Sequence, residues 1–147
     1  MATLLLIFFG TFWEASMDLI GTPHNFEASV WKKLANWFDA QGRSALGNRF
    51  WDNRLAWRNK WKDGDPANGP AFPGASTVFV TFMDGWHVVK FFWLMHVFAA
   101  IVFYEPISGY FFVDMLIIYC AFGLGHELFF LLLQDKKLLP GRESDAD

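Results

Sequence analysis

Residues 83–96 read MDGWHVVKFFWLMH, and this stretch decides the fold. It begins with a polar and aromatic cluster and continues into an apolar segment that ends near Tyr104. An acid, two histidines and a lysine therefore lie in or beside a segment long enough to cross a bilayer. Because ionisable groups are costly at membrane depth, they indicate a functional site there.

The composition also favours a membrane protein. Of the 147 residues, 54% are hydrophobic, and they include 18 Phe and 8 Trp. A soluble domain of this composition would have little polar surface, whereas lipid-facing positions can be apolar. We therefore predict an all-α fold, an integral membrane helical bundle that forms a single domain over residues 1–147. The net charge of −3 is too small to indicate nucleic-acid binding, and the expected partner is the lipid bilayer.

The apolar segments predict about three transmembrane helices, over residues 2–20, 77–104 and 110–133. The sequence EPISG at residues 105–109 is typical of a tight reversal between the last two spans. The first span resembles a signal peptide. However, no lysine or arginine precedes its apolar run, and Glu14 falls where a cleavage region is normally neutral, so we expect it to be a retained helix.

Two shorter segments between the first and second spans predict amphipathic helices. Phe26–Phe38 has apolar residues at helical spacing, with charged residues between them. Ser44–Lys62 is basic and rich in tryptophan, which suits contact with lipid headgroups better than stacking on nucleic acid. Packing on the protein's own core remains an equal alternative for Phe26–Phe38. We expect four tryptophans near the headgroups: Trp31, Trp37, Trp51 and Trp57.

The lysines and arginines predict the orientation. Residues 21–76 hold eight of them and residues 134–147 hold three, whereas the N-terminus and the 105–109 turn hold none. The positive-inside rule then makes residues 21–76 a cytoplasmic loop and residues 134–147 a cytoplasmic tail, with the N-terminus outside. Three alternating spans satisfy this arrangement.

This topology brings polar groups from all three spans to the cytoplasmic leaflet. Carboxylates mixed with imidazoles bind divalent transition metals or transfer protons. Seven residues are therefore candidate metal ligands: Glu14, Asp18, His24, Asp84, His87, His126 and Glu127.

Each candidate also has a purely structural interpretation. Asp84 is well placed to cap the second span, and polar residues near helix ends often only reach for water. His126 and Glu127 are adjacent, so they point in different directions on a helix. His96 lies half a turn out of phase with His87, and we expect it to bond a neighbouring helix instead.

The sequence WRNKWK at residues 57–62, the Gly69–Gly74 loop and DGWH at residues 84–87 together resemble a group of uncharacterised small bacterial membrane proteins. The resemblance covers roughly the middle third of the chain, and it implies no reaction. No nucleotide-binding, nucleophile-elbow, zincin or CxxC motif is present in the sequence.

Three functions follow from the sequence as hypotheses, and the third of them, proton or ion conduction, would require the three spans to oligomerise. The first is a metal or proton site at the cytoplasmic leaflet, catalytic or sensory, that acts on a lipid-soluble substrate. The second is a non-enzymatic membrane assembly or accessory subunit, present as a homo-oligomer or within a larger membrane complex. The sequence favours neither an enzyme nor a non-enzyme.

Overall fold

The computed structural model describes residues 1–134, and these residues form helices and turns without an extended strand. Three helices are long and apolar enough to cross a membrane: α1 (Ala2–Gly21), α6 (Gly85–Val102) and α7 (Phe111–Leu133). The fold is thus all-helical and compatible with membrane integration. Of the predicted tail, residues 134–147, the first residue is described and residues 135–147 lie outside the described part.

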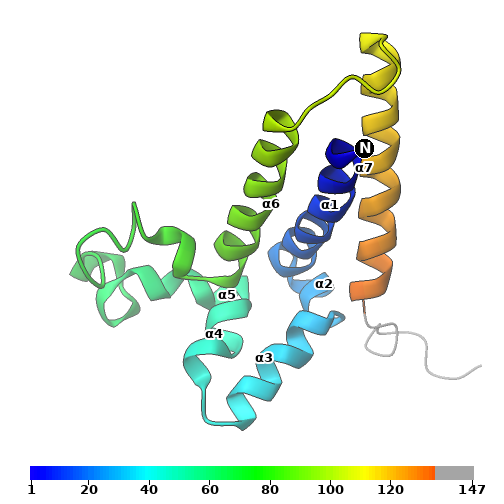
Figure 1. Ribbon diagram of the computed structural model, residues 1–147. Coiled ribbons are helices and arrows are strands. Elements are labelled where there is room, and N and C mark those ends of the chain that lie inside the picture. Colours follow the sequence, from blue (N-terminus) through cyan, green and yellow to red (C-terminus); the bar gives the residue numbers. More distant parts are fainter. Residues whose placement is uncertain (135–147) are drawn as a thin grey trace, which may run out of the picture.

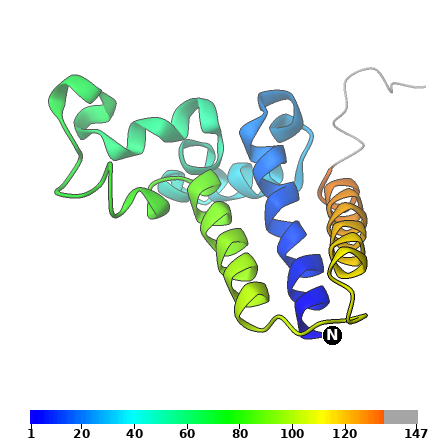
Figure 2. The ribbon, with the colours of Figure 1, turned by 90° about the horizontal axis from the view of Figure 1, so that it is seen from above.

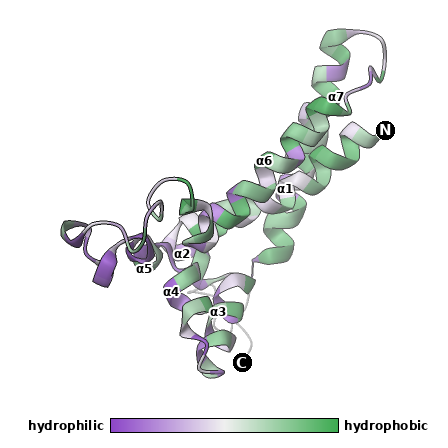
Figure 3. Ribbon diagram, turned by 60° about the vertical axis from the view of Figure 1, so that its left-hand side comes forward, coloured by the Kyte–Doolittle hydropathy of each residue, from purple (hydrophilic) through white to green (hydrophobic). Residues whose placement is uncertain are grey.

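The three long helices lie side by side with α1 in the middle (Figures 1 and 2). Both α6 and α7 pack on α1 rather than chiefly on each other. The helices α1 and α7 run in the same direction, and α6 runs in the opposite one (Figure 1). All three are mostly hydrophobic along their length, whereas the segment that contains α3 to α5 carries most of the hydrophilic residues (Figure 3).

The second long helix starts later than the sequence predicts, at Gly85 instead of Thr77. Asp84 causes this start, because its carboxylate accepts a hydrogen bond from the backbone N–H of His87 at 2.9 Å. Residues 77–83 instead form turns, including the short 3₁₀ helix η5 (Val80–Phe82).

The first long helix ends at Gly21 because the next residues cannot continue it. Thr22 is extended, with φ of −109° and ψ of 118°, as expected for a residue that precedes proline. Pro23 then begins the short helix α2 (Pro23–Glu27), where its fixed φ suits the first helical position. The chain therefore turns immediately after α1.

The predicted amphipathic helix at residues 26–38 corresponds to the end of α2 and to α3 (Val30–Ala40). Ser29 separates the two helices and caps α3 by accepting a hydrogen bond from Lys32 N at 3.4 Å. The backbone of Ser29 also forms an isolated bridge with Gln134, directly after α7. The end of α7 is thereby attached to the junction of α2 and α3.

The predicted single helix at residues 44–62 is wrong, because four short helices occupy this stretch: η1 (Ser44–Leu46), α4 (Asn48–Trp51), α5 (Asn53–Ala56) and η2 (Trp57–Lys60). Side-chain carboxylates interrupt the helix by bonding the backbone. The Asp39 carboxylate accepts from Asn48 N at 3.0 Å, and Asp52 accepts from Arg54 N at 3.0 Å. Two more 3₁₀ turns follow, η3 (Lys62–Gly64) and η4 (Pro66–Asn68).

The buried core lies where α1 and α6 meet the shorter helices. Its fully buried members come from four helices: Ile20, Phe26, Ala35 and Val89. Trp31 and Trp51 pack against this cluster and stack on each other, with ring centroids 4.7 Å apart. The alternative of packing on the protein's own core, stated for residues 26–38, therefore holds for Trp31, and Trp51 packs on the same cluster. The location of these two tryptophans near the headgroups stays a prediction.

Trp37 and Trp57 are the two exposed members of the four, with 53% and 39% of their surface accessible. Their location near headgroups stays a prediction. The measurement that checks it is quenching by lipid-attached quenchers of known depth.

An ion-pair network attaches α5 to α2 and α3. Arg54 binds the Asp52 carboxylate through two nitrogens and also contacts Glu27, which in turn pairs with Lys32 at 3.1 Å. Burial is the largest single effect and would raise the pKa of Glu27 and of Asp52, but the hydrogen bonds and positive charges of Arg54 and Lys32 together outweigh it and lower the pKa of both carboxyls. Carboxylates with lowered pKa contribute stability above their ordinary pKa, and this contribution is lost as the pH falls through the folded-state values.

Asp114 closes the reversal between α6 and α7. Its carboxylate accepts from Tyr104 Oη at 3.0 Å, from Ile107 N at 2.9 Å and from Ser108 N at 2.7 Å. The Ser108 hydroxyl donates a fourth bond at 2.6 Å. The carboxylate is thus committed to holding the turn, which accounts for an acid in the third long helix.

Candidate functional site

Two carboxylates of α1 and one imidazole of α7 meet in the structure. The Nε2 atom of His126 lies 3.1 Å from Glu14 Oε2 and 3.3 Å from Asp18 Oδ2. Among the described residues, these three form the group of histidine, cysteine and carboxylate ligands whose ligand atoms all lie within 4.8 Å of one another. We refer to Glu14, Asp18 and His126 as the triad.

The helical register brings the triad together. Glu14 and Asp18 are four residues apart, so they share one face of α1. Glu14 and His126 each lie seven residues before the last residue of their helix, which is about 10 Å at about 1.5 Å per residue. Because α1 and α7 run in the same direction, the two residues have a similar depth in the bundle.

Gly125 lets the two helices approach closely enough for the triad to form. A methyl group at Gly125 would lie 2.4 Å from Thr11 Oγ1 and 3.2 Å from the Phe8 carbonyl oxygen. Small residues at such contacts are typical of membrane helix pairs. Since His126 directly follows Gly125, this close contact of the helices lies next to the triad.

The side chains of the triad are partly buried in the protein. The side chains of Glu14 and His126 are 22% and 23% exposed, whereas that of Asp18 is 56% exposed. The Glu14 Oε2 atom is buried, and within residues 1–134 it has no hydrogen-bond partner of good geometry. Buried carboxylate oxygens normally have a hydrogen-bond partner or bind a cation. A proton or a metal ion between Glu14 Oε2 and His126 Nε2 would satisfy this atom.

The distances from His126 Nε2 to the two carboxylates match those between ligands that share one metal ion. Zinc bonds imidazole nitrogen and carboxylate oxygen at about 2.0–2.2 Å, so two such ligands at roughly 90–110° lie about 3–3.5 Å apart. The two observed distances, 3.1 and 3.3 Å, fall within this range. The same geometry also suits a protonated imidazole held between two carboxylates.

Asp84 and His87 form a separate pair at the start of α6. His87 Nδ1 lies 2.8 Å from both carboxylate oxygens of Asp84, which is buried. This contact orients the imidazole and leaves its Nε2 atom facing away from the carboxylate. No third ligand atom joins this pair within 4.8 Å in the described part of the chain.

The remaining candidates from the sequence lie apart from the triad. His24 in α2 and Glu127 in α7 are both exposed. The structure therefore brings together three of the seven predicted ligands and leaves the other four outside this cluster. His96 bonds the carbonyl oxygen of Phe92 within its own helix at 2.8 Å, instead of a neighbouring helix as predicted.

Sequence reasoning did not identify two contributors to the site, Thr11 and Gly125. The sequence GLGH at residues 123–126 held a signal for Gly125, since small residues beside a polar residue in an apolar helix indicate a helix contact. The sequence around Thr11 held no such signal. In the structure its hydroxyl donates to the Phe8 carbonyl oxygen of its own helix at 2.6 Å.

Comparison with known proteins identifies no relative. No protein-family model matches the chain, and neither a curated protein nor a solved structure is similar to it.

Proposed function

We propose that this protein is a small integral membrane protein that binds a divalent transition metal at the triad, in the cytoplasmic leaflet. One observation carries the proposal: His126 Nε2 lies within 3.3 Å of a carboxylate oxygen from both Glu14 and Asp18. One nitrogen and two carboxylate oxygens suit zinc, iron or manganese. Three protein ligands leave a coordination position open, which is the arrangement of catalytic zinc sites.

The exposed Asp18 side chain supports access to the metal from outside the bundle. A small molecule dissolved in the lipid or at its surface would reach the open position past this side chain. The metal would supply Lewis acidity to such a ligand. The chain's own contribution is to hold the ligands in place, through the contact of α1 with α7 at Gly125.

Metal content of the detergent-purified protein tests the proposal. Asp18→Ala and His126→Ala should each weaken binding of added Zn²⁺ or Mn²⁺ at least about tenfold, since even residues that only support a ligand cost that much. His87→Ala and His96→Ala are matched controls, because both remove an imidazole outside the triad. Mass spectrometry of metal per protein gives the result.

Two outcomes would contradict the metal site. One is wild-type protein that remains folded and takes up no metal. The other is equal loss of metal in His126→Ala and His96→Ala. Either outcome would favour the second candidate, a non-enzymatic assembly or accessory subunit. That candidate is supported by α7, of which only Asp114 and Gly125 are buried, so most of its apolar surface is free for a partner helix.

The orientation is part of the proposal. Eight lysines and arginines lie in residues 21–76 and none in the 105–109 turn, so we expect the short helices in the cytoplasm and the 105–109 turn outside. A reporter protein fused after Asp147 should be active in the cytoplasm, and one fused at the N-terminus should be active outside. A C-terminal fusion that is active outside would reverse the orientation and place the triad in the opposite leaflet.

A further inference from the structure

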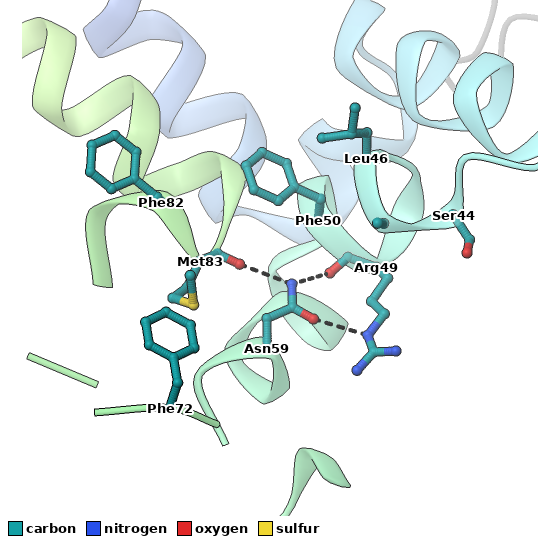
Figure 4. Close-up of a pocket in the computed structure, with 9 residues that line it drawn as sticks. Ser44, Leu46, Arg49, Phe50, Asn59, Phe72, Phe82 and Met83 are labelled. Carbon is teal, nitrogen blue, oxygen red and sulfur yellow. Dashed lines mark hydrogen bonds between the residues drawn. The ribbon is translucent and has the colours of Figure 1, made fainter. Parts of the chain in front are cut away.

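A cavity of about 390 Å³ lies beside the residues that directly precede α6, and none of the triad residues lines it. Its walls are largely aromatic and aliphatic, and Figure 4 shows the rings of Phe50, Phe72 and Phe82 around it. Phe82 is 60% exposed and Phe72 is 42% exposed, so the cavity opens at the surface of the protein. Its volume is that of a ligand pocket and far exceeds the space that one ion needs.

Asn59 forms the polar side of the cavity. Its Nδ2 donates to the carbonyl oxygens of Arg49 at 3.0 Å and Met83 at 2.9 Å (Figure 4). Its Oδ1 accepts from Arg49 Nε at 3.0 Å. Both amide hydrogens of Asn59 are therefore used, and the side chain fixes Arg49 beside the segment that leads into α6. The two terminal nitrogens of the Arg49 guanidinium remain as donors for a ligand.

A second arginine lies close to Arg49. An adjoining cavity of about 270 Å³ is also lined by Arg49, together with Arg58, Leu55 and Asp63. Within residues 1–134, neither Arg49 nor Arg58 forms an ion pair with a carboxylate. This contrasts with Arg54, which binds two carboxylates in the same segment. Arg49 lines both cavities, and Arg58 lines the adjoining one, where the two arginines outnumber the one carboxylate, that of Asp63. Guanidinium groups without a bound carboxylate next to an apolar cavity favour an amphiphilic anion.

The position of the cavity indicates where such an anion would come from. Phe82 and Met83 directly precede the cap of α6 at Asp84. Since α6 is apolar enough to span a membrane, residues at its first turn lie at headgroup height. Basic pockets at this height bind the headgroups of anionic lipids.

We propose that Arg49 and Arg58 bind the phosphate of an anionic phospholipid while the cavity of Phe50, Phe72 and Phe82 holds the upper part of its acyl chain. The lipid belongs to the leaflet in which α6 begins. Asn59 of η2 already bonds Met83, directly before α6. A lipid bound to Arg58 of η2 and to Phe82 would hold the same two parts of the chain together. The site is independent of the metal, so failure of one proposal leaves the other standing.

Lipid binding to the purified full-length chain tests this proposal. We expect native mass spectrometry in detergent to show phosphatidylglycerol bound about tenfold more tightly than phosphatidylcholine, the effect of about one charge-assisted contact. Arg49→Met and Arg58→Met should each reduce phosphatidylglycerol to the level of phosphatidylcholine. Arg43→Met is the matched control, since Arg43 is exposed and lines neither cavity. It should leave the preference unchanged.

Two further measurements keep the proposal falsifiable. Arg58→Met decides the result if Arg49→Met fails to fold, because Arg49 also bonds Asn59 and Arg58 has no such bond. Glycerol 3-phosphate carries the phosphate without acyl chains, and we expect it to leave lipid binding unchanged at equal concentration. Three results would overturn the proposal: equal affinity of the wild type for both lipids, a preference that survives in the Arg49→Met/Arg58→Met double variant, or competition by glycerol 3-phosphate as strong as that by the lipid.

Discussion

Gly125→Ala is expected to destabilise the folded bundle by about 2 kcal/mol, the usual cost of an added methyl group in a tightly packed contact. The new methyl group would lie 2.4 Å from Thr11 Oγ1 and 3.2 Å from the Phe8 carbonyl oxygen. The hydroxyl can rotate away, but the backbone carbonyl cannot, so α7 must move away from α1. The loss should be measured by circular dichroism during denaturation of detergent-solubilised protein with sodium dodecyl sulfate.

Gly123→Ala is the matched control, because it lies in the same helix and a methyl group there meets no atom within 4 Å. It should be neutral or stabilising by up to about 1 kcal/mol, the difference in helix propensity between glycine and alanine. Thr11→Ala should partly relieve the effect of Gly125→Ala. Equal stability of Gly123→Ala and Gly125→Ala would show that the close contact of α1 and α7 does not exist.

The same substitution also tests the triad. His126 follows Gly125 directly, so separation of the helices would move its imidazole away from Glu14 and Asp18. Gly125→Ala should therefore lose bound metal even though it removes no ligand, while Gly123→Ala should retain it. Retained metal in a destabilised Gly125→Ala protein would place the metal outside the triad.

Trp51→Ala is expected to cost about 3 kcal/mol, because it removes a large aromatic side chain from a packed cluster. The Trp51 ring stacks on Trp31 at 4.7 Å and packs so closely on Gly85 that a methyl group there would lie 2.3 Å from it. The variant therefore loses contacts to α3 and to the first turn of α6 together. Circular dichroism during denaturation gives the loss without depending on tryptophan fluorescence.

Two comparisons separate the contribution of packing from other effects of tryptophan. Trp37→Ala should cost about 0.5 kcal/mol or less, because Trp37 is 53% exposed. Trp51→Phe should retain much of the stability, since it keeps a stacked ring and removes an indole N–H that has no partner among the described residues. If Trp37→Ala and Trp51→Ala are equally destabilised, the cluster does not hold the short helices to α6.

The sequence alone predicted the features that depend on local composition and spacing. Runs of apolar residues gave the three long helices, because a helix of about 20 such residues satisfies its own backbone and matches a bilayer. Asp84 was expected as a cap and does cap α6. The four-residue spacing of Glu14 and Asp18 was sufficient to place both on one face of α1.

Local sequence could not show that residues 44–62 break into short helices. The first break in the helix is caused by the carboxylate of Asp39, which lies in the preceding helix α3. A basic and aromatic pattern is compatible with a long surface helix and with a folded segment alike. For the same reason, periodicity did not distinguish Trp51, which packs inside, from Trp37, which faces outside.

Only the tertiary structure decided which histidine meets the carboxylates of α1. From the sequence, His87 and His126 are both candidates to contact Glu14 and Asp18, since both lie near the same end of the bundle. The rotation of each helix about its own axis selects between them, and this rotation depends on contacts between helices. Gly125 against Thr11 turns His126 towards Glu14 and Asp18, whereas Asp84 holds His87 at the start of α6. The contacts between α1 and α7 join residues more than a hundred positions apart, so no local pattern in the sequence encodes them.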